Sequence, residues 1–341
     1  MKDLQRLRVE DTSQVGEARR LAAAVCRGLG FEETLVGQAA LVVTEMATNL
    51  LKHAAGGEIL LRSVEWPDAP GIEILSLDRG PGISNLGESL RDGHSTSGSP
   101  GTGLGAIRRL SSSFDIYSVS GKGTAMLSRI WKTPPPMPPD PLPPHTLTVG
   151  AVCLPVTGEE ACGDAWAVHQ VRDRALIMVA DGLGHGQDAA EAAAEAVRVF
   201  RKDATRGPGE IIHIMHSALK STRGAAVAVA EVVRGPRIVR YAGVGNISGR
   251  ILSDDASRNM VSHNGTAGVE VRKIQEYTYP WPENGLLILH SDGLATHWSL
   301  DDYPGLHQKH PSLIAGILFR DHTRGRDDVT VVAAMEEKAT P

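Results

Sequence analysis

Acidic residues stand at the ends of several apolar, strand-like runs in the second half of the sequence. Two of these runs lead into the same tripeptide, Asp-Gly-Leu, at Asp181 and Asp292. Asp164 precedes a third run, and the pair Asp327-Asp328 precedes a fourth. A single Asp-Gly pair is an ordinary turn, but strands of one sandwich can bring all of these carboxylates together. Divalent cations must then neutralise them, and all-oxygen ligands favour Mg²⁺ or Mn²⁺ over Zn²⁺. Two such ions can lower the pKa of a shared water and position it for attack on a phosphoryl group.

A second group of polar residues lies on one predicted helix in the first half. Glu45, Asn49 and His53 recur every four residues and form a stripe, beside an apolar stripe that includes Val42 and Met46. Asn49 can hold a hard cation through its side-chain oxygen, and Glu45 can orient or deprotonate a nucleophile. On their own, these three residues fit a solvated helix face slightly better.

An aspartate at another strand end suggests a base-binding position. Asp78 follows the strand-like run 72–77 and is followed by Gly80 and Gly82. A carboxylate there can accept a hydrogen bond from an exocyclic amine, and the glycines let a flat base approach the backbone. The alternative is a simple Gly-Pro turn.

A glycine-rich run precedes the next predicted helix, in the order Gly101, Thr102, Gly103, Leu104 and Gly105. Free N–H groups and the positive dipole end of a helix suit phosphates. The run also fits a loose dinucleotide-binding fingerprint, but a loop precedes it instead of the buried strand which that fingerprint needs.

The elements that must position these residues differ between the two halves. The first half is predicted as helix, helix, hairpin, loop, helix and hairpin, with helices at 13–29, 32–54 and 105–112. The second half is mostly strands joined by short turns, with helices near 188–202, 210–219 and 312–319. The expected fold class is therefore α/β followed by α+β.

A proline-rich segment at 133–145 separates the two halves and is predicted to be an extended spacer. We therefore expect one domain over 1–132 and a second over 146–341. Hydrophobic residues make up 41% of the 341 residues and charged residues 22%, so each half can build its own core.

Composition excludes several classes of function. The formal net charge of −5 and the 4% aromatic content disfavour a nucleic-acid binder. The three cysteines have no metal-binding spacing, which favours a reducing compartment. We find no signal peptide and no apolar run approaching the length of a membrane span, so we expect a cytoplasmic protein without membrane or nucleic-acid partners.

The motifs of the first half, ExxxNxxxH, DxGxG and GTGLGA in this order, resemble the GHKL ATPase family, and within it the anti-sigma-factor serine kinases of the RsbT and RsbW type. The resemblance spans about residues 8–131. It implies a Bergerat α/β sandwich that holds ATP with Mg²⁺, with Glu45 as catalytic base, Asn49 on magnesium and Asp78 reading adenine. The other implied ATP-contacting residues are His53, Gly80, Gly82, Gly101, Thr102, Gly103, Leu104 and Gly105.

The motifs of the second half resemble the metal-dependent PPM serine/threonine phosphatases of the SpoIIE and RsbX branch. They are GD at 163–164, DGLGHG at 181–186, AGVGN at 242–246, SDGL at 291–294 and DDVTVV at 327–332. The resemblance covers about residues 146–335 and implies a β-sandwich flanked by helices. The implied metal ligands are Asp164, Asp181, Asp292 and Asp327, with the carbonyl of Gly182 and with Asp328 as the alternative to Asp327.

Three further positions in this half are less determined by the resemblance. Cys162 stands where the family usually has glycine, which puts the geometry of that loop in question. His185 is either a contact to substrate phosphate or an exposed loop histidine. The turn at 243–246 is interpreted as structural.

Together, the two resemblances imply a bifunctional regulator. The first half would phosphorylate serine or threonine, and the second half, with Mn²⁺ or Mg²⁺, would remove such phosphates. The implied partner is a STAS-domain anti-sigma antagonist or a stressosome-like scaffold protein in a bacterial stress pathway. The alternatives are a phosphatase whose first half only senses ATP or binds a partner, and an anti-sigma factor that holds a sigma factor directly.

Overall fold

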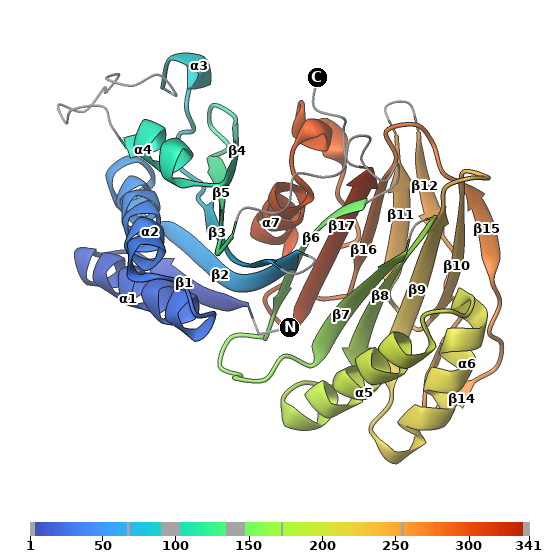
Figure 1. The fold of residues 1–341 in the computed structure, drawn as a ribbon. Helices are drawn as coiled ribbons and strands as arrows, with labels where there is room; N and C mark the ends of the chain where they lie inside the picture. Colours follow the sequence, from blue (N-terminus) through green and yellow to red (C-terminus); the bar gives the residue numbers. More distant parts are fainter. Residues whose placement is uncertain are drawn as a thin grey trace. The chain divides into compact units, whose positions relative to one another are not determined.

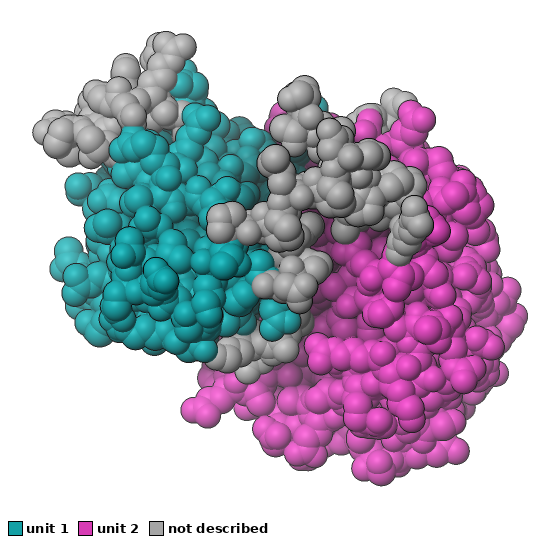
Figure 2. Space-filling view, viewed as in Figure 1, with its two compact units in different colours: residues 1–139, 308–320 teal, residues 140–307, 321–341 magenta. Residues whose placement is uncertain are grey.

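The protein was analysed as a computed structural model, which describes residues 4–66, 69–89, 103–133, 147–171, 173–253 and 256–336. The chain divides into two compact units, coloured separately in Figure 2. Unit 1 contains residues 1–139 and 308–320, and unit 2 contains residues 140–307 and 321–341. The proline-rich segment predicted as a spacer lies almost entirely outside the described residues.

Unit 1 is built on one antiparallel sheet with the strand order β1-β2-β3-β5-β4. The strands are β1 (Gln5–Val9), β2 (Gly57–Trp66), β3 (Ala69–Leu77), β4 (Ser113–Ser118) and β5 (Thr124–Trp131). The helices are α1 (Thr12–Gly28), α2 (Glu33–Ala54), α3 (Leu86–Ser89) and α4 (Gly103–Leu110). Helices α1, α2 and α4 cover one face of the sheet (Figure 1), so the expected α/β layering is confirmed.

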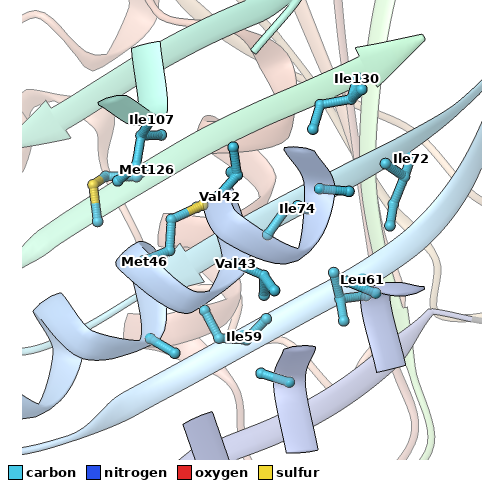
Figure 3. Packing of buried hydrophobic residues seen from close by; sticks show 14 of the residues in the cluster. Val42, Val43, Met46, Ile59, Leu61, Ile72, Ile74, Ile107, Met126 and Ile130 are labelled. Carbon is cyan, nitrogen blue, oxygen red and sulfur yellow. The ribbon is translucent and has the colours of Figure 1, made fainter. Parts of the chain in front are cut away.

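The core of unit 1 explains why α2 lies where it does. Val42 and Met46 are fully buried and pack with Ile59 and Ile74 of the sheet (Figure 3). By length and composition α2 is also apolar enough to cross a membrane, so the prediction that no apolar run approaches the length of a membrane span is wrong for this helix. Its buried stripe is instead occupied by the sheet, as in the core helix of a globular fold.

The opposite face of this sheet is also buried, and a distant part of the sequence belongs to it. Leu75 and Leu77 of β3 are buried on this face. Helix α7 (Pro311–His322), which follows most of the second half in sequence, lies in unit 1 through Arg320. A Cβ atom built on Gly316 would stand 2.6 Å from Leu75 Cδ2, so α7 packs closely on β3. The sequence placed this helix with the second domain.

Unit 2 contains two five-stranded antiparallel sheets, with orders β15-β10-β9-β8-β7 and β12-β11-β16-β17-β6. The first uses β7 (Asp164–Val171), β8 (Arg174–Gly182), β9 (Ala225–Val233), β10 (Ile238–Val244) and β15 (Tyr277–Pro280). The second uses β6 (Leu147–Leu154), β11 (Ser248–Leu252), β12 (Ser257–Met260), β16 (Leu286–His290) and β17 (Val329–Glu336). A small ribbon pairs β13 (Gly265–Thr266) with β14 (Glu270–Val271).

Two hydrophobic clusters hold unit 2 together. One cluster joins the inner faces of the two sheets through residues such as Ile177, Tyr241 and Leu289. The other lies between the first sheet and helices α5 (Gln187–Asp203) and α6 (Pro208–Ala218). The expected sandwich with helices is therefore present (Figure 1). The short strands β1, β11, β12, β13, β14 and β15 were not predicted from the sequence.

Candidate functional site

The first candidate site begins on α2. Glu45 and Asn49 are half-buried on the face next to the apolar stripe, whereas His53 is exposed near the helix end. A Cβ atom built on Gly103 would lie 3.2 Å from Glu45 Oε2 and 3.9 Å from Asn49 Oδ1. The start of α4 therefore meets the carboxylate and the amide, and a side chain at this position would occupy the space beside them.

The second part of this site is the end of β3, at Asp78. The side chain is buried, and its Oδ1 accepts hydrogen bonds from the N–H groups of Gly80 (2.8 Å) and Thr124 (3.1 Å). Burial raises the pKa of Asp78, and these hydrogen bonds and the charge of Arg320 oppose the shift. The carboxyl group is thus fixed in orientation by main-chain donors.

Glycines surround Asp78 because the backbone passes too close for side chains. Gly123 has φ of +82°, and a Cβ atom there would stand 2.1 Å from the Asp78 carbonyl oxygen. Gly82 has φ of +71°, and its Cβ would stand 2.3 Å from the carbonyl oxygen of Val119. At Gly80 the Cβ would collide with Ala54 at the end of α2. The predicted Gly80 and Gly82 are therefore required sterically in the segment after Asp78, and Gly123, which was not predicted as a site residue, is required against Asp78 itself.

The predicted phosphate run is only partly described. Gly101 and Thr102 lie outside the described residues, so the structure says nothing of them. Gly103 begins α4, and Gly105 is buried within it. Leu104 packs against the hydrophobic core of unit 1.

The second candidate site is the acidic cluster of unit 2. Asp164 and Asp181 are direct partners in the register of β7 and β8. Burial, and then the charges of Asp164, Asp292, Asp327 and Asp328, raise the pKa of Asp181 to about 9. The five predicted carboxylates therefore lie in one electrostatic neighbourhood, as the strand-end argument predicted.

The segment 291–293 is hydrogen-bonded to the start of β7 and packs against the start of β17. Ser291 Oγ donates to Asp164 Oδ2 (2.6 Å) and accepts from the N–H of Thr330 (2.9 Å). A Cβ atom on Gly293 would stand 1.9 Å from the carbonyl oxygen of Asp328. Only glycine lets the loop carrying Asp292 pass this close to the segment before β17.

Different hydrogen bonds distinguish the roles of the adjacent residues Asp327 and Asp328. Asp328 Oδ1 accepts from the N–H of Val156 (2.7 Å), and its Oδ2 accepts from the N–H of Gly163 (2.7 Å). Asp328 is buried and holds the loop that leads to Asp164. Asp327 Oδ1 accepts from the N–H of Asp328 (2.9 Å), its neighbour in the sequence.

Several contacts around the acidic cluster were not predicted. Asn246 Nδ2 donates to Asp292 Oδ2 (2.7 Å), so the turn interpreted as structural also holds a candidate ligand. His185 is exposed, with Nδ1 2.8 Å from Glu159 Oε1. The spacing of Asn246 relative to Asp292 carries no periodic signal, because the two residues meet only through the pairing of distant strands.

The side chain of Cys162 packs against a second cysteine. Cys162 is partly buried, and its Sγ lies 3.7 Å from Sγ of Cys153 on β6. Cys153 Sγ is in turn 3.5 Å from the carbonyl oxygen of Asp164. The thiol thus packs at the edge of the acidic cluster, next to Gly163, whose N–H is held by Asp328.

The acidic cluster fits a divalent cation. Within the described part of the chain, Asp164 Oδ1 is buried and has no hydrogen-bond partner, and burial raises the pKa of Asp164 well above its ordinary value. Among the residues that the structure describes, no group of three or more acidic, histidine or cysteine side chains is arranged so that it could hold a metal ion as it stands. A bound cation would give Asp164 Oδ1 a partner and would favour the ionised form of the neighbouring acids.

Comparisons with known proteins match the two parts of the chain separately. A family model described as the histidine kinase-like ATPase domain matches residues 9–129, and the SpoIIE model, stage II sporulation protein E, matches residues 172–335. The serine/threonine-protein kinase RsbT of Bacillus subtilis (strain 168) is 32% identical over 131 residues, which is 38% of this chain and 98% of RsbT. The first part of the chain belongs to the histidine kinase-like ATPase family, and the second part carries a SpoIIE domain of the PPM phosphatase type.

Solved structures resemble the chain over a little more than half its length. A chain from a structure described as the bacterial stressosome, a modular system adapted to control secondary messenger signaling, is 29% identical with a TM-score of 0.53. The match covers 56% of this chain and 100% of that one. A crystal structure of RsbX in complex with magnesium is 23% identical with a TM-score of 0.49, covering 56% of this chain and 96% of that one.

Proposed function

We propose that the SpoIIE domain is a metal-dependent phosphatase for phosphoserine and phosphothreonine on a regulatory protein. The observation that carries this proposal is geometric: the register of β7 and β8 pairs Asp164 with Asp181, and Ser291, the neighbour of Asp292, is hydrogen-bonded to Asp164. Asp164, Asp181, Asp292 and Asp327 would hold Mn²⁺ or Mg²⁺, assisted by the carbonyl of Gly182. Bound cations would supply a water of lowered pKa for attack on phosphorus.

The protein's own groups around this centre have distinct roles in the proposal. Asn246 and Ser291 orient Asp292 and Asp164 through the hydrogen bonds described above. Asp328 is assigned to holding the loop before Asp164, because both of its oxygens accept main-chain N–H groups. Asp327 is therefore the proposed ligand of the adjacent pair.

The ATPase domain is proposed to be a serine/threonine kinase that uses ATP and Mg²⁺. Glu45 would act as the base and Asn49 would contact magnesium, and both lie beside Gly103 at the start of α4. Asp78 would accept the exocyclic amine of adenine, because main-chain donors already fix its Oδ1. The likeness to RsbT, named as a serine/threonine-protein kinase, supports this assignment.

The proposed partner is a STAS-domain anti-sigma antagonist or a stressosome-like scaffold protein in the cytoplasm. The likeness to RsbT and to a stressosome-related structure supports this choice. Since opposite activities on one target would waste ATP, we propose that they alternate under control. A direct hold on a sigma factor is the competing hypothesis, and a pull-down with sigma subunits tests it.

The phosphatase proposal is tested by incubating the full chain with Mn²⁺ and a STAS partner phosphorylated on serine. We expect phosphate release that stops when a chelator removes the metal. Absence of release with any phosphorylated STAS partner would refute the assignment. The kinase proposal is tested with labelled ATP, where Glu45→Ala should abolish labelling of the partner while Lys52→Ala, an exposed change on the same helix, should not.

A second candidate function for the ATPase domain is nucleotide sensing without phosphoryl transfer. The observation that favours it is the hydrogen bond from Arg320 to the carbonyl oxygen of Asp78 (2.6 Å). Through this bond, the proposed base-binding position is attached to a helix that continues into the SpoIIE domain. ATP binding without labelling of any partner would support sensing over catalysis.

A further inference from the structure

Helix α7 is attached to the sheet of unit 1 by a buried polar cluster at its start. Ser312 Oγ donates a hydrogen bond to Glu73 Oε2 (2.9 Å), and Arg129 Nε donates to the same oxygen (2.7 Å). Burial opposes ionisation of Glu73, but the charges of Arg62 and Arg129 outweigh it and hold its pKa at about 2. A buried charge with matched partners fixes one arrangement of the groups around it.

A second set of contacts fixes the segment just before α7. Lys309 Nζ and the N–H of His310 donate to the two oxygens of Asp115 on β4, at 3.0 and 2.9 Å. Further along, the absent side chain of Gly316 allows contact with Leu75, as described above. The helix is buried from Pro311 to Arg320. It is therefore a structural part of the nucleotide-binding unit.

The last turn of α7 reaches the proposed base-binding position. Arg320 is buried, and its Nη1 donates to the main-chain oxygen of Asp78. Gly123 lies against the same oxygen, and Asp78 Oδ1 accepts a hydrogen bond from the N–H of Thr124 at the start of the neighbouring strand β5. The position of the Asp78 carboxyl group therefore depends on where α7 ends.

The chain that leaves α7 enters the metal loop of unit 2 within a few residues. His322 accepts a hydrogen bond from the N–H of Ala295 (2.9 Å), and the N–H of Arg324 donates to the carbonyl oxygen of Gly293 (2.8 Å). Gly293 follows Asp292, and the chain reaches Asp327 three residues after Arg324. One continuous segment thus carries the contact to Asp78 and the contacts to the proposed metal loop.

We propose that α7 transmits nucleotide occupancy from the ATPase domain to the phosphatase centre, with Arg320 as the positioning residue at its nucleotide end. The inference rests on the proposed binding of ATP near Asp78 and on the proposed phosphatase activity. A base that hydrogen-bonds Asp78 favours one position of the strand end, and hence one position of Arg320 and of the segment that follows. By linkage, a nucleotide that prefers one state of this segment must change the state of the metal loop.

The test measures phosphatase activity of the full chain on p-nitrophenyl phosphate at constant free Mn²⁺, with and without a nonhydrolysable ATP analogue. We expect the analogue to change the wild-type rate at least threefold. Arg320→Gln should reduce this ratio to near one, and Arg320→Lys should restore part of it. Arg201→Gln, an exposed change on α5, is the matched control and should keep the wild-type ratio.

A second readout separates positioning from simple destabilisation. Calorimetric titration with ATP and GTP should show that Arg320→Gln lowers the preference for ATP over GTP about tenfold, because Asp78 loses its fixed place. A wild-type ratio near one, or a ratio and base preference unchanged by Arg320→Gln, would overturn the coupling and leave the proposed activities standing. A wild-type chain that binds neither nucleotide or releases no phosphate would overturn the proposed function, and the coupling with it.

Discussion

The two candidate sites of this chain consist of different chemical groups: close-packed main chain in one and carboxylates in the other. In the ATPase domain, glycines and main-chain groups surround Asp78 closely. A Cβ atom on Gly123 would stand only 2.1 Å from the carbonyl oxygen of Asp78. In the SpoIIE domain, carboxylates from four strand ends share one field, and the pKa of Asp181 rises to about 9. The first site should therefore be sensitive to added volume, and the second to lost charge.

The largest effect is expected from removing one charge at the acidic cluster. Asp292→Asn keeps the shape of the side chain but weakens the hold on a cation, so phosphatase activity should fall on the order of a thousandfold. Activity with Mn²⁺ and nucleotide affinity are both measured on the full chain. Asp301→Asn, at an exposed position, is the control. Retention of more than a tenth of the activity would remove Asp292 from the proposed ligands.

The same cluster predicts a pH dependence of stability in metal-free protein. The pKa of Asp181 is raised from 3.8 to about 9 in the folded state, first by burial and then by neighbouring carboxylates. Between these values the folded state holds a proton that the unfolded state has released, so the free energy of unfolding falls as pH rises. We therefore expect the protein to lose stability steadily across this window.

The measurement is thermal unfolding in chelator at pH 5.5 and 8.5. The melting temperature should fall with pH, and Asp181→Asn should flatten the dependence. Mn²⁺ should restore stability at the higher pH, since a cation stabilises the ionised form. A melting temperature that rises over this interval in chelator would contradict the assignment of Asp181 to a crowded, buried acid site.

A larger side chain should have its main effect at the other site, beside Asp78 in the ATPase domain. Gly123→Ala puts a methyl group where only 2.1 Å separates it from the Asp78 carbonyl oxygen, at φ of +82°. We expect a loss of about 1–3 kcal/mol of stability and a roughly tenfold weaker binding of ATP. Gly121→Ala has a similar φ of +78° but open space around it, so it carries the backbone strain alone.

The comparison of these two variants isolates the steric term. Chemical denaturation gives their stabilities, and calorimetry gives the nucleotide affinities. If Gly121→Ala weakens ATP binding as much as Gly123→Ala, the close approach at Asp78 is not what shapes the nucleotide site.

The sequence predicted the parts of both sites that depend on local spacing. A four-residue period places Glu45 and Asn49 beside the apolar stripe of α2, and repeated Asp-Gly-Leu marks two of the acidic strand ends. It could not predict contacts made by sheet register and loop crossing, such as Asn246 with Asp292. The choice between Asp327 and Asp328 also required knowing which carboxylate accepts the N–H groups of a loop far away in sequence.

The placement of α7 shows the same limit at the level of a whole element. Its apolar pattern predicts a buried helix but does not say which sheet buries it. The deciding residues are Ser312, Gly316 and Arg320, and each acts through a partner in the first half of the chain. Short strands such as β11 were missed for a related reason, because Ser248–Leu252 is too short and too polar to show a period.

The smallest effect is expected where this chain already has extra volume at the acidic site. Cys162 stands where the resemblance to PPM phosphatases implies a glycine; its Sγ lies 3.7 Å from that of Cys153, and the N–H of Gly163 keeps its hydrogen bond to Asp328. Cys162→Gly should therefore change phosphatase activity by no more than about threefold and stability by about 1 kcal/mol or less. Cys153→Ser tests the same thiol contact from the other side and should also have a small effect. Activity with Mn²⁺ and denaturant midpoints measure both variants. A loss comparable to that of Asp292→Asn would mean that the shape of this loop, and not the charge of the carboxylates alone, sets the phosphatase centre.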